Sequence, residues 1–472
     1  MILFYLTIPA FIIFFVSFFE IDKAKKILPY SSFLVLLPII YLFLVDKPYN
    51  LIGDYMIATK LNTYVLLVSS IVAIGVILSL ITLDKRVKIS KKGYIQFYRF
   101  FATFWLGLTV SILSNNMGIY WIGLELATLS TVYMIKTNLS KRSISEAWNY
   151  MIVGTIAISL VLFGIILIYA SAKPVLAEDA MNFQLLLENI KYIKSKTLFE
   201  IGFLMVSLGM FIKMGFFPMS LWLANIERAS YYPIAALFSG ILESAILVGF
   251  FNFSSLAMKI NPSGVFAFVF IYAFLTLFII TFLLFKAKDF IRLFSLSGIE
   301  HMVIITLFWV SGAHFAALLH FGAHAFLKPA LFLSSGILEF KKKYNFAGTL
   351  KGFGGFYGNL FYYLVGFLIL AVISLPPSPM FFSEIYGISA IFSIALKSKY
   401  MLLVLTFVLL FLFLLSIIFY KFIQVYQSMK YEGEEVEKVV YVNEILSICI
   451  FALATLSLLS PLAFNYLKGI YE

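Results

Sequence analysis

Apolar runs of about 20 residues recur along almost the whole chain, and each has the length of one membrane-spanning helix. Of the 472 residues, 62% are hydrophobic and only 12% are charged, whereas soluble domains have about 25% charged residues. No polar stretch is long enough to form a separate soluble domain. The sequence therefore predicts an all-α, multi-pass membrane protein with a single transmembrane domain, residues 1–472.

The apolar runs predict about 14 transmembrane helices. They begin near Ile2, Leu28, Tyr64, Phe97, Met117, Ala147, Leu198, Pro233, Gly264, Leu293, Ala313, Phe361, Met401 and Ile445. We expect helices 1–3 in residues 1–96 and a C-terminal helix 14 in residues 431–472. Between them we expect two repeats, helices 4–8 in residues 97–255 and helices 9–13 in residues 256–430.

Two of the predicted helices are interrupted by proline, which removes a helix hydrogen bond and clashes with the preceding turn. Helix 7 is broken at Pro218, and helix 12 is broken at Pro376, Pro377 and Pro379. The breaks are five spans apart, and a charged residue lies close to each of them. This pattern is typical of transporters built from two inverted repeats, here of five helices each. Two unrelated proline kinks are the simpler alternative.

Basic residues cluster in the loops that follow odd-numbered spans, as at Lys23–Lys26, Lys85–Lys92 and Lys341–Lys343. By the positive-inside bias these loops are cytoplasmic, so we expect both termini on the outer side of a prokaryotic plasma membrane. Orientation and anionic lipid together account for the net charge of +12. The charge therefore gives no reason to expect a nucleic-acid partner.

Ionisable residues in the middle of spans are the main functional signal, because a charge in hydrocarbon is costly unless it faces protein or water. Lys213 is the one charged residue in the run Ile201–Phe217, and Glu125 lies in a similar apolar run. Burial disfavours both charges and an ion pair restores both, so a proton could be held or released as the pair forms or breaks. A static salt bridge that locks two helices is the alternative.

His320, His324 and Lys328 are spaced four residues apart and therefore lie on one face of one helix. Histidine titrates near neutral pH, which favours a proton relay along this face, and His301 on the preceding span could extend it. A zinc site would need a third ligand, and the sequence has no HExxH motif and no cysteine pair. Two core histidines bound by neighbouring groups are the other alternative.

Two carboxylates complete the set of candidate translocation residues. Glu384 follows the break in helix 12 and occupies the place in the second repeat that Lys213 has in the first. We expect Glu384 to be the exit group towards the outside. Glu243, on helix 8, could connect the first repeat to the histidines. Either carboxylate could instead cap a broken backbone.

No redox or nucleotide centre is expected in the chain itself. Its single cysteine, Cys449, cannot ligate an iron–sulfur cluster, and no GxGxxG or GxxxxGK[ST] motif is present. The sequence therefore predicts no cofactor, no bound metal and no catalytic residue. The energy for transport must come from a partner or from an ion gradient.

Seven segments together resemble the antiporter-like membrane subunits shared by respiratory complex I, multi-subunit sodium/proton antiporters and group 4 hydrogenases. They are Trp121–Leu126, Glu146–Tyr150, Lys213–Leu223, Pro233–Gly240, Asp289–Met302, His320–Phe332 and Pro376–Glu384. Within that family, Ser295–Met302 and His324–Phe332 look most like component F of hydrogenase 4.

The resemblance implies a proton-translocating subunit of a membrane-bound, ion-pumping oxidoreductase complex, either a group 4 hydrogenase or a related ferredoxin-driven complex. It implies that Lys213 is the central proton carrier and Glu125 its partner. His320, His324 and Lys328 would form a lateral polar axis, and Glu384 would be the terminal carrier.

The implied partners are other antiporter-like subunits, lipid, and a peripheral redox module that holds iron–sulfur centres and, in a hydrogenase, a nickel–iron centre. The resemblance also implies a departure: relatives in respiratory complex I usually carry lysine on helix 8 where this chain has Glu243, so the order of proton transfers or the ion carried could differ. A sodium-carrying antiporter subunit and a non-conducting membrane scaffold of the same fold are the alternatives.

Overall fold

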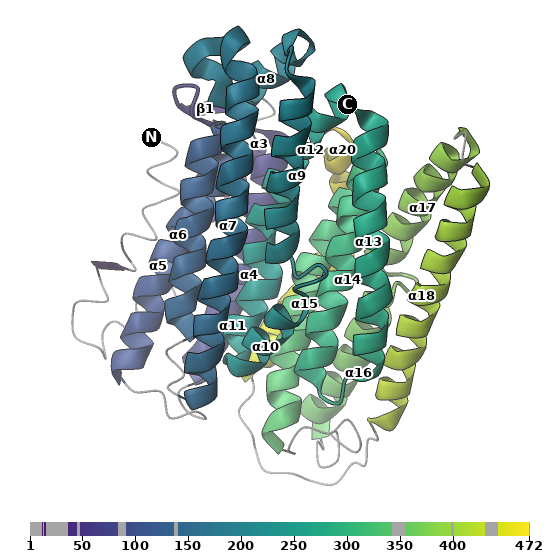
Figure 1. Ribbon diagram of the computed structural model, residues 1–472. Coiled ribbons are helices and arrows are strands. Elements are labelled where there is room, and N and C mark those ends of the chain that lie inside the picture. The colour runs from purple at the N-terminus through teal and green to yellow at the C-terminus, as the bar shows by residue number, and fades with distance from the viewer. Residues whose placement is uncertain are drawn as a thin grey trace. The chain divides into compact units, whose positions relative to one another are not determined.

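The computed structural model describes residues 36–44, 48–83, 91–135, 140–341, 355–397, 401–429 and 442–471, together with residues 12, 14 and 15. Helices make up nearly all of this part of the chain (Figure 1). Most of the first two predicted spans and the basic residues Lys23–Lys26 and Lys85–Lys88 lie outside it. The orientation of the chain in the membrane therefore stays a prediction.

The chain folds as two compact units. Unit 1 comprises Met1–Ile77, Asp84–Gly215 and Ile241–Phe268, and unit 2 comprises Leu78–Leu83, Phe216–Gly240 and Val269–Glu472. The candidate residues are divided between the units. Glu125, Lys213 and Glu243 belong to unit 1, and the histidines, Lys328 and Glu384 belong to unit 2.

The helices of unit 1 surround the end of α9, where Lys213 stands. In chain order its elements are α3 (Leu36–Leu44), strands β1 (Tyr49–Ile52) and β2 (Met56–Ala58), most of α4 (Lys60–Leu83), α5 (Lys91–Leu113), α6 (Met117–Ile135), α7 (Lys141–Leu176), α8 (Phe183–Asn189), α9 (Lys196–Lys213) and α12 (Glu243–Ile260). The two strands pair antiparallel and are the exception to the predicted all-α fold within the described residues.

Glycine residues bring α7 and α9 together backbone against backbone. A Cβ atom at Gly164 would lie 2.5 Å from the carbonyl oxygen of Gly202, and one at Gly209 would lie 2.4 Å from that of Ala157. Small residues permit this close approach between membrane helices. The contact holds the C-terminal end of α9 against α7, one turn before Lys213.

Unit 2 has α14 and α15 at its buried centre. Its helices are α10 (Leu221–Ala229), α11 (Tyr232–Leu237), most of α13 (Pro262–Phe285), α14 (Phe290–Val310), α15 (His314–Lys341), α16 (Gly355–Val372), α17 (Pro379–Lys397), α18 (Met401–Ser428), α19 (Val442–Ser457) and α20 (Pro461–Lys468). Asp289 caps α14 by accepting from the backbone N–H of Arg292 at 2.9 Å. The same carboxylate pairs with Arg228 of α10 at 3.2 Å and so joins these two helices.

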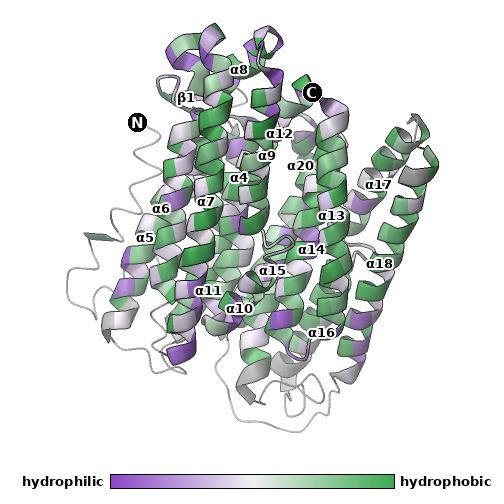
Figure 2. Ribbon diagram, viewed as in Figure 1, coloured by the Kyte–Doolittle hydropathy of each residue, from purple (hydrophilic) through white to green (hydrophobic). Residues whose placement is uncertain are grey.

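Within the described residues, nine helices are long and apolar enough to cross a membrane, or ten if the bent pair α19–α20 counts as one span. Figure 2 shows hydrophobic residues along most of the length of these helices. A described helix begins close to each predicted start from Tyr64 to Ile445. The chain is therefore a polytopic membrane protein, and the total of about 14 helices stays a prediction.

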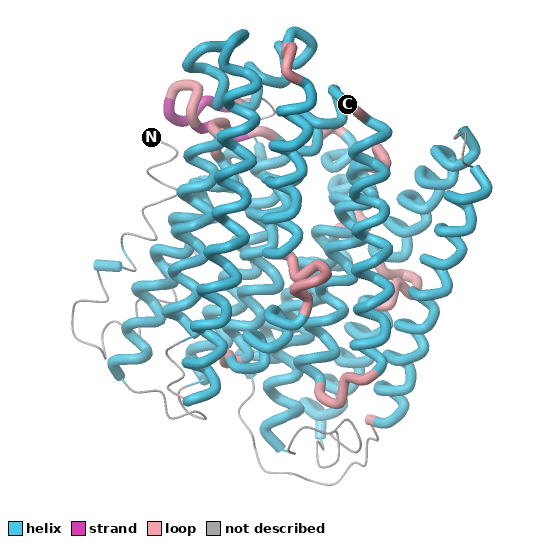
Figure 3. Tube along the Cα trace, in the orientation of Figure 1, coloured by secondary structure: helices cyan, strands magenta, loops and turns pink. Residues whose placement is uncertain are grey.

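Both breaks predicted from the prolines lie in loops between helices (Figure 3). α9 ends at Lys213 and α10 begins at Leu221, whereas α16 ends at Val372 and α17 begins at Pro379. Gly215, with a φ of +76°, permits the turn after α9, because glycine adopts positive φ without strain. Pro379 is the first residue of α17, a position where its missing N–H leaves no helix hydrogen bond unmade.

Candidate proton-translocation sites

Lys213 is the last residue of α9 and stands where the helical path is interrupted. Its side chain is only 3% exposed. The ammonium donates a hydrogen bond to the Thr128 hydroxyl of α6, with 2.7 Å between Nζ and Oγ1. The same hydroxyl donates to the Leu124 carbonyl at 2.8 Å. Since the Thr128 proton is directed to the backbone, its oxygen is free to accept from Lys213.

Tyr150 of α7 completes the surroundings of this ammonium. Nζ of Lys213 lies 5.6 Å from the centroid of the Tyr150 ring, within the range of a cation–π interaction. The Tyr150 hydroxyl is 2.9 Å from that of Thr131 on α6. A buried cation is therefore held by a hydroxyl of α6 and an aromatic face of α7.

Glu125 lies one turn before Thr128 on α6 and is half-buried. Its carboxylate interacts electrostatically with Lys213, and its Oε2 atom is buried without a hydrogen-bond partner among the described residues. The structure thus brings Glu125 and Lys213 into one site, but the direct hydrogen bond of the ammonium goes to Thr128. Thr128 was not predicted from the sequence, although its spacing of three residues from Glu125 places it on the same helix face.

Glu243 is the first residue of α12 and directly follows a π-helical turn, Phe238–Leu242. Its side chain is 3% exposed. α12 packs against α9, and the Tyr120 hydroxyl of α6 donates to the Ala245 carbonyl at 3.2 Å. Single π-helical turns inside helices occur frequently at functional sites. Glu243 therefore belongs to the same helix assembly as Lys213.

Two histidines of unit 2, His301 and His320, form a hydrogen-bonded series with Ser383 across three helices. His301 Nδ1 on α14 is 3.0 Å from His320 Nε2 on α15, and His320 Nδ1 is 2.8 Å from the Ser383 hydroxyl on α17. The His301 ring also lies 5.5 Å, centroid to centroid, from that of His324. A neutral imidazole has one donor and one acceptor nitrogen, so this series can pass a proton from group to group.

Lys328 lies on the same helix as His320 and His324 and is fully buried. Its ammonium donates to the Phe294 carbonyl of α14 at 3.0 Å. It also interacts electrostatically with two buried carboxylates, Glu227 on α10 and Glu300 on α14. Neither carboxylate was predicted from the sequence as a partner of Lys328. Glu300 could have been found as a carboxylate within an apolar run, whereas Glu227 stands beside Arg228 and gave no such signal.

Glu384 lies on α17, next to Ser383 in the chain. Its carboxylate accepts a short hydrogen bond from the Ser374 hydroxyl and interacts electrostatically with Glu300. Glu384 is therefore adjacent to both the histidine series, through Ser383, and the carboxylate pair of Lys328, through Glu300. No cluster of three His, Cys, Asp or Glu residues that could hold a metal ion occurs within the described ranges.

Comparison with known proteins identifies the family of this chain. Residues 114–414 match the NADH:quinone oxidoreductase/Mrp antiporter transmembrane family. The chain is 34% identical over 294 residues to a hydrogenase-4 component F homolog of Methylacidiphilum infernorum, and the aligned region spans 61% of each protein. It is 25% identical over 388 residues to NADH-quinone oxidoreductase subunit N 1 of Aquifex aeolicus, with 80% of each covered.

The fold is also similar to a solved structure. A chain of the membrane-bound sulfane sulfur reductase, an archaeal respiratory membrane complex, superposes with a TM-score of 0.81 at 18% identity. The superposition covers 99% of this chain and 96% of the other. At this identity the likeness is one of fold.

Proposed function

Because this chain belongs to the NADH:quinone oxidoreductase/Mrp antiporter transmembrane family, we propose that it is a proton-translocating subunit of a membrane-bound, ion-pumping oxidoreductase complex. The similarity to a hydrogenase-4 component F homolog favours a complex of the group 4 hydrogenase type or a related ferredoxin-driven complex. Its partners would be other antiporter-like subunits and a peripheral redox module that holds the metal centres. The complex would lie in the plasma membrane of a prokaryote.

The observation that carries this proposal is the buried ammonium of Lys213 at the end of α9. A lysine at membrane depth that serves only to join helices would be expected to form a close ion pair. Lys213 instead donates to a neutral hydroxyl and has the Glu125 carboxylate on the next turn of α6. An ammonium between a hydroxyl and a carboxylate has an acceptor for its proton close by, as a proton carrier requires.

The second unit supplies the later carriers in this proposal. Protons are taken up from the cytoplasm near α9 or α12, are held at Lys213, and leave by the groups of unit 2. Those groups are His301, His320 and His324, the ammonium of Lys328, and finally Glu384. The hydrogen bonds from His301 through His320 to Ser383 support the last part of this route.

We also propose that the two helix breaks belong to two inverted five-helix repeats within a fold of about 14 spans. The support is that each break lies beside a candidate carrier, Lys213 after α9 and Glu384 near the start of α17. In such repeats the interrupted helices contribute the ion-binding groups near the middle of the bilayer.

Substitution of Lys213 in the assembled complex tests the proposal. Lys213→Ala removes the carrier, and Lys213→Arg keeps a cation that does not release its proton. Both variants should still transfer electrons and assemble but should lose proton translocation. If both variants pump at the wild-type ratio, the chain is a scaffold and the proposal is wrong. If charge movement in the wild type needs sodium, the chain carries Na⁺ instead.

A further inference from the structure

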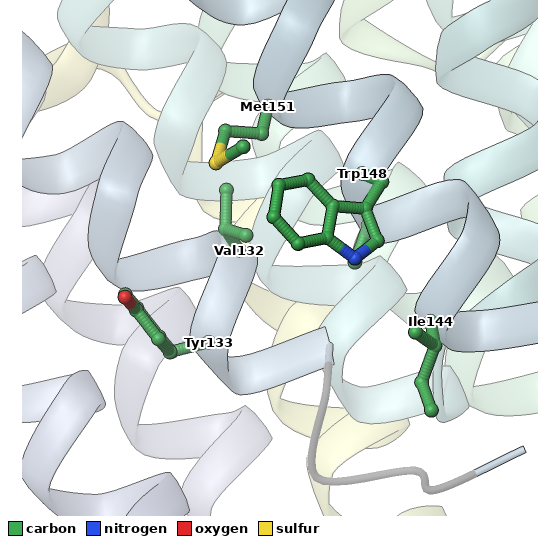
Figure 4. A pocket seen from close by; sticks show the side chains of 6 residues that line it. Val132, Tyr133, Ile144, Trp148 and Met151 are labelled. Atoms are coloured by element: carbon green, nitrogen blue, oxygen red, sulfur yellow. The ribbon is translucent and has the colours of Figure 1, made fainter.

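A groove on the outer surface of α6 and α7 lies apart from the candidate translocation residues. Its volume is about 130 Å³, and it is lined by Val132, Tyr133, Ile144, Ala147, Trp148 and Met151. Figure 4 shows the Trp148 indole between the two helices, with Val132 and Met151 beside it. Trp148 is 58% exposed and Tyr133 is 49% exposed, so the groove is open to its surroundings.

The size and lining of the groove suit a hydrocarbon segment. An apolar cavity of about 150 Å³ accommodates one benzene molecule, so a groove of this volume holds a few carbon atoms. Four of the six lining residues are aliphatic or thioether side chains, and the other two are the aromatic types that gather at membrane interfaces. The groove therefore fits part of one acyl chain rather than a polar ligand.

A cationic end lies next to the groove on the same helix. Lys141, Ile144 and Trp148 are spaced at i, i+3 and i+7, which places them on one face of α7. Lys141 and its neighbour Arg142 are both exposed. Glu146 lies on a different face of α7 from Lys141 and accepts a hydrogen bond from Asn149 at 3.3 Å. It stands four residues after Arg142, so it offsets part of the charge of Arg142 but not that of Lys141, which lies on the face of the groove.

The spacing along α7 matches the layers of a bilayer. A helix rises about 1.5 Å per residue, so Trp148 lies about 10 Å and Met151 about 15 Å further along the axis than Lys141. The headgroup region of each leaflet is about 6 Å thick. With Lys141 at the phosphate level, the backbone of Trp148 lies a few ångströms inside the hydrocarbon, and helical side chains lean back toward the N-terminus, here towards the interface where tryptophan is enriched. Met151 lies deeper in the hydrocarbon.

We propose that this groove binds one acyl chain of an anionic phospholipid whose phosphate group is bound by Lys141 and Arg142. The charge argues for a lipid over a helix of another subunit. A neighbouring transmembrane helix would cover the apolar lining but would leave the Lys141 cation at the phosphate level without an anionic partner. An anionic phospholipid matches both the apolar groove and the cationic end.

Brominated phospholipids provide the test, because bromine on an acyl chain quenches the fluorescence of a tryptophan that it touches. The full-length chain is reconstituted into liposomes with brominated chains on either phosphatidylglycerol, which is anionic, or phosphatidylcholine, which is zwitterionic. The chain has five tryptophans, so the Trp148 signal is taken as the difference from Trp148→Phe. The same measurement is made on the complex purified with its partner subunits.

We expect the wild type to favour phosphatidylglycerol at Trp148 by about 5- to 30-fold, which corresponds to about 1 kcal/mol for Lys141 and up to the same again for Arg142. Lys141→Gln should lower this preference about fivefold. Lys173→Gln is the matched control, since Lys173 is an exposed cation at the other end of α7 and should leave the preference unchanged. Ala147→Phe, which fills the groove, should abolish the quenching of Trp148 while helical content is retained.

Two results would overturn the inference. Equal quenching by the two lipids in the wild type would mean that only unselective surrounding lipid reaches Trp148. Absence of quenching by either lipid in the purified complex would mean that a protein subunit covers this face. Neither result depends on whether the chain translocates protons.

Discussion

Replacement of Thr128 by valine should slow proton translocation without blocking electron transfer. The substitution keeps the shape of the side chain and removes the hydroxyl that accepts a hydrogen bond from the Lys213 ammonium at 2.7 Å. A hydrogen bond to a charged group contributes about 1.5–3 kcal/mol. Loss of this bond makes the protonated carrier less stable by that amount. Each 1.4 kcal/mol is a factor of about ten in an equilibrium constant, so proton binding at Lys213 should weaken about 10- to 100-fold. The translocation rate should fall by the same factor, because fewer Lys213 side chains carry a proton.

The assay is proton uptake by inverted membrane vesicles that contain the assembled complex, followed with a pH-sensitive dye while electron transfer is recorded in parallel. Thr128→Ser is the control because it keeps the hydroxyl and should retain most of the rate. A Thr128→Val complex that pumps within twofold of the wild type would refute the reasoning. Equal loss in Thr128→Ser would show that the shape of the side chain matters and the hydrogen bond does not.

Two further pairs of substitutions test the carboxylates and the packing. Glu300→Gln should lower proton translocation at least tenfold in the vesicle assay, because Glu300 interacts with both Lys328 and Glu384. Glu227→Gln should lower it less, because Glu227 interacts with Lys328 but not with Glu384. Equal rates in these two variants would count against a role for Glu300 between Lys328 and Glu384. Gly209→Ala should destabilise the protein by about 1–3 kcal/mol, because its new Cβ meets the α7 backbone at 2.4 Å, and a thermal-unfolding scan measures this. Gly298→Ala, whose nearest neighbour would be 3.7 Å away, is the control, and equal loss of stability in both variants would contradict the packing argument.

The positions of the helices could be predicted from the sequence because the length and hydropathy of an apolar run are enough to identify a membrane span. Described helices begin close to the predicted starts from Tyr64 onwards. The prolines also marked where helices are interrupted, since Pro218 lies between α9 and α10. The division into two compact units could not be predicted, because it depends on tertiary contacts that no local pattern records.

The candidate residues could be identified but their partners could not. Lys213 and Glu125 stand out as charges in apolar runs, yet the hydrogen bond of Lys213 goes to Thr128. Which of several polar groups meets an ammonium depends on the rotation of α6 against α9, which a sequence does not give. Glu227 was missed for a similar reason. Its helix is short, and only the tertiary fold turns its carboxylate towards Lys328.

The central claim is that this chain carries protons, and proton uptake driven by electron transfer tests it most directly. Inverted vesicles with the wild-type complex should acidify inside when electron donor is added in sodium-free buffer. A protonophore should abolish the acidification, and the Lys213→Ala complex should show none while it still oxidises the donor. Acidification that requires sodium, or that persists unchanged in Lys213→Ala, would contradict the account.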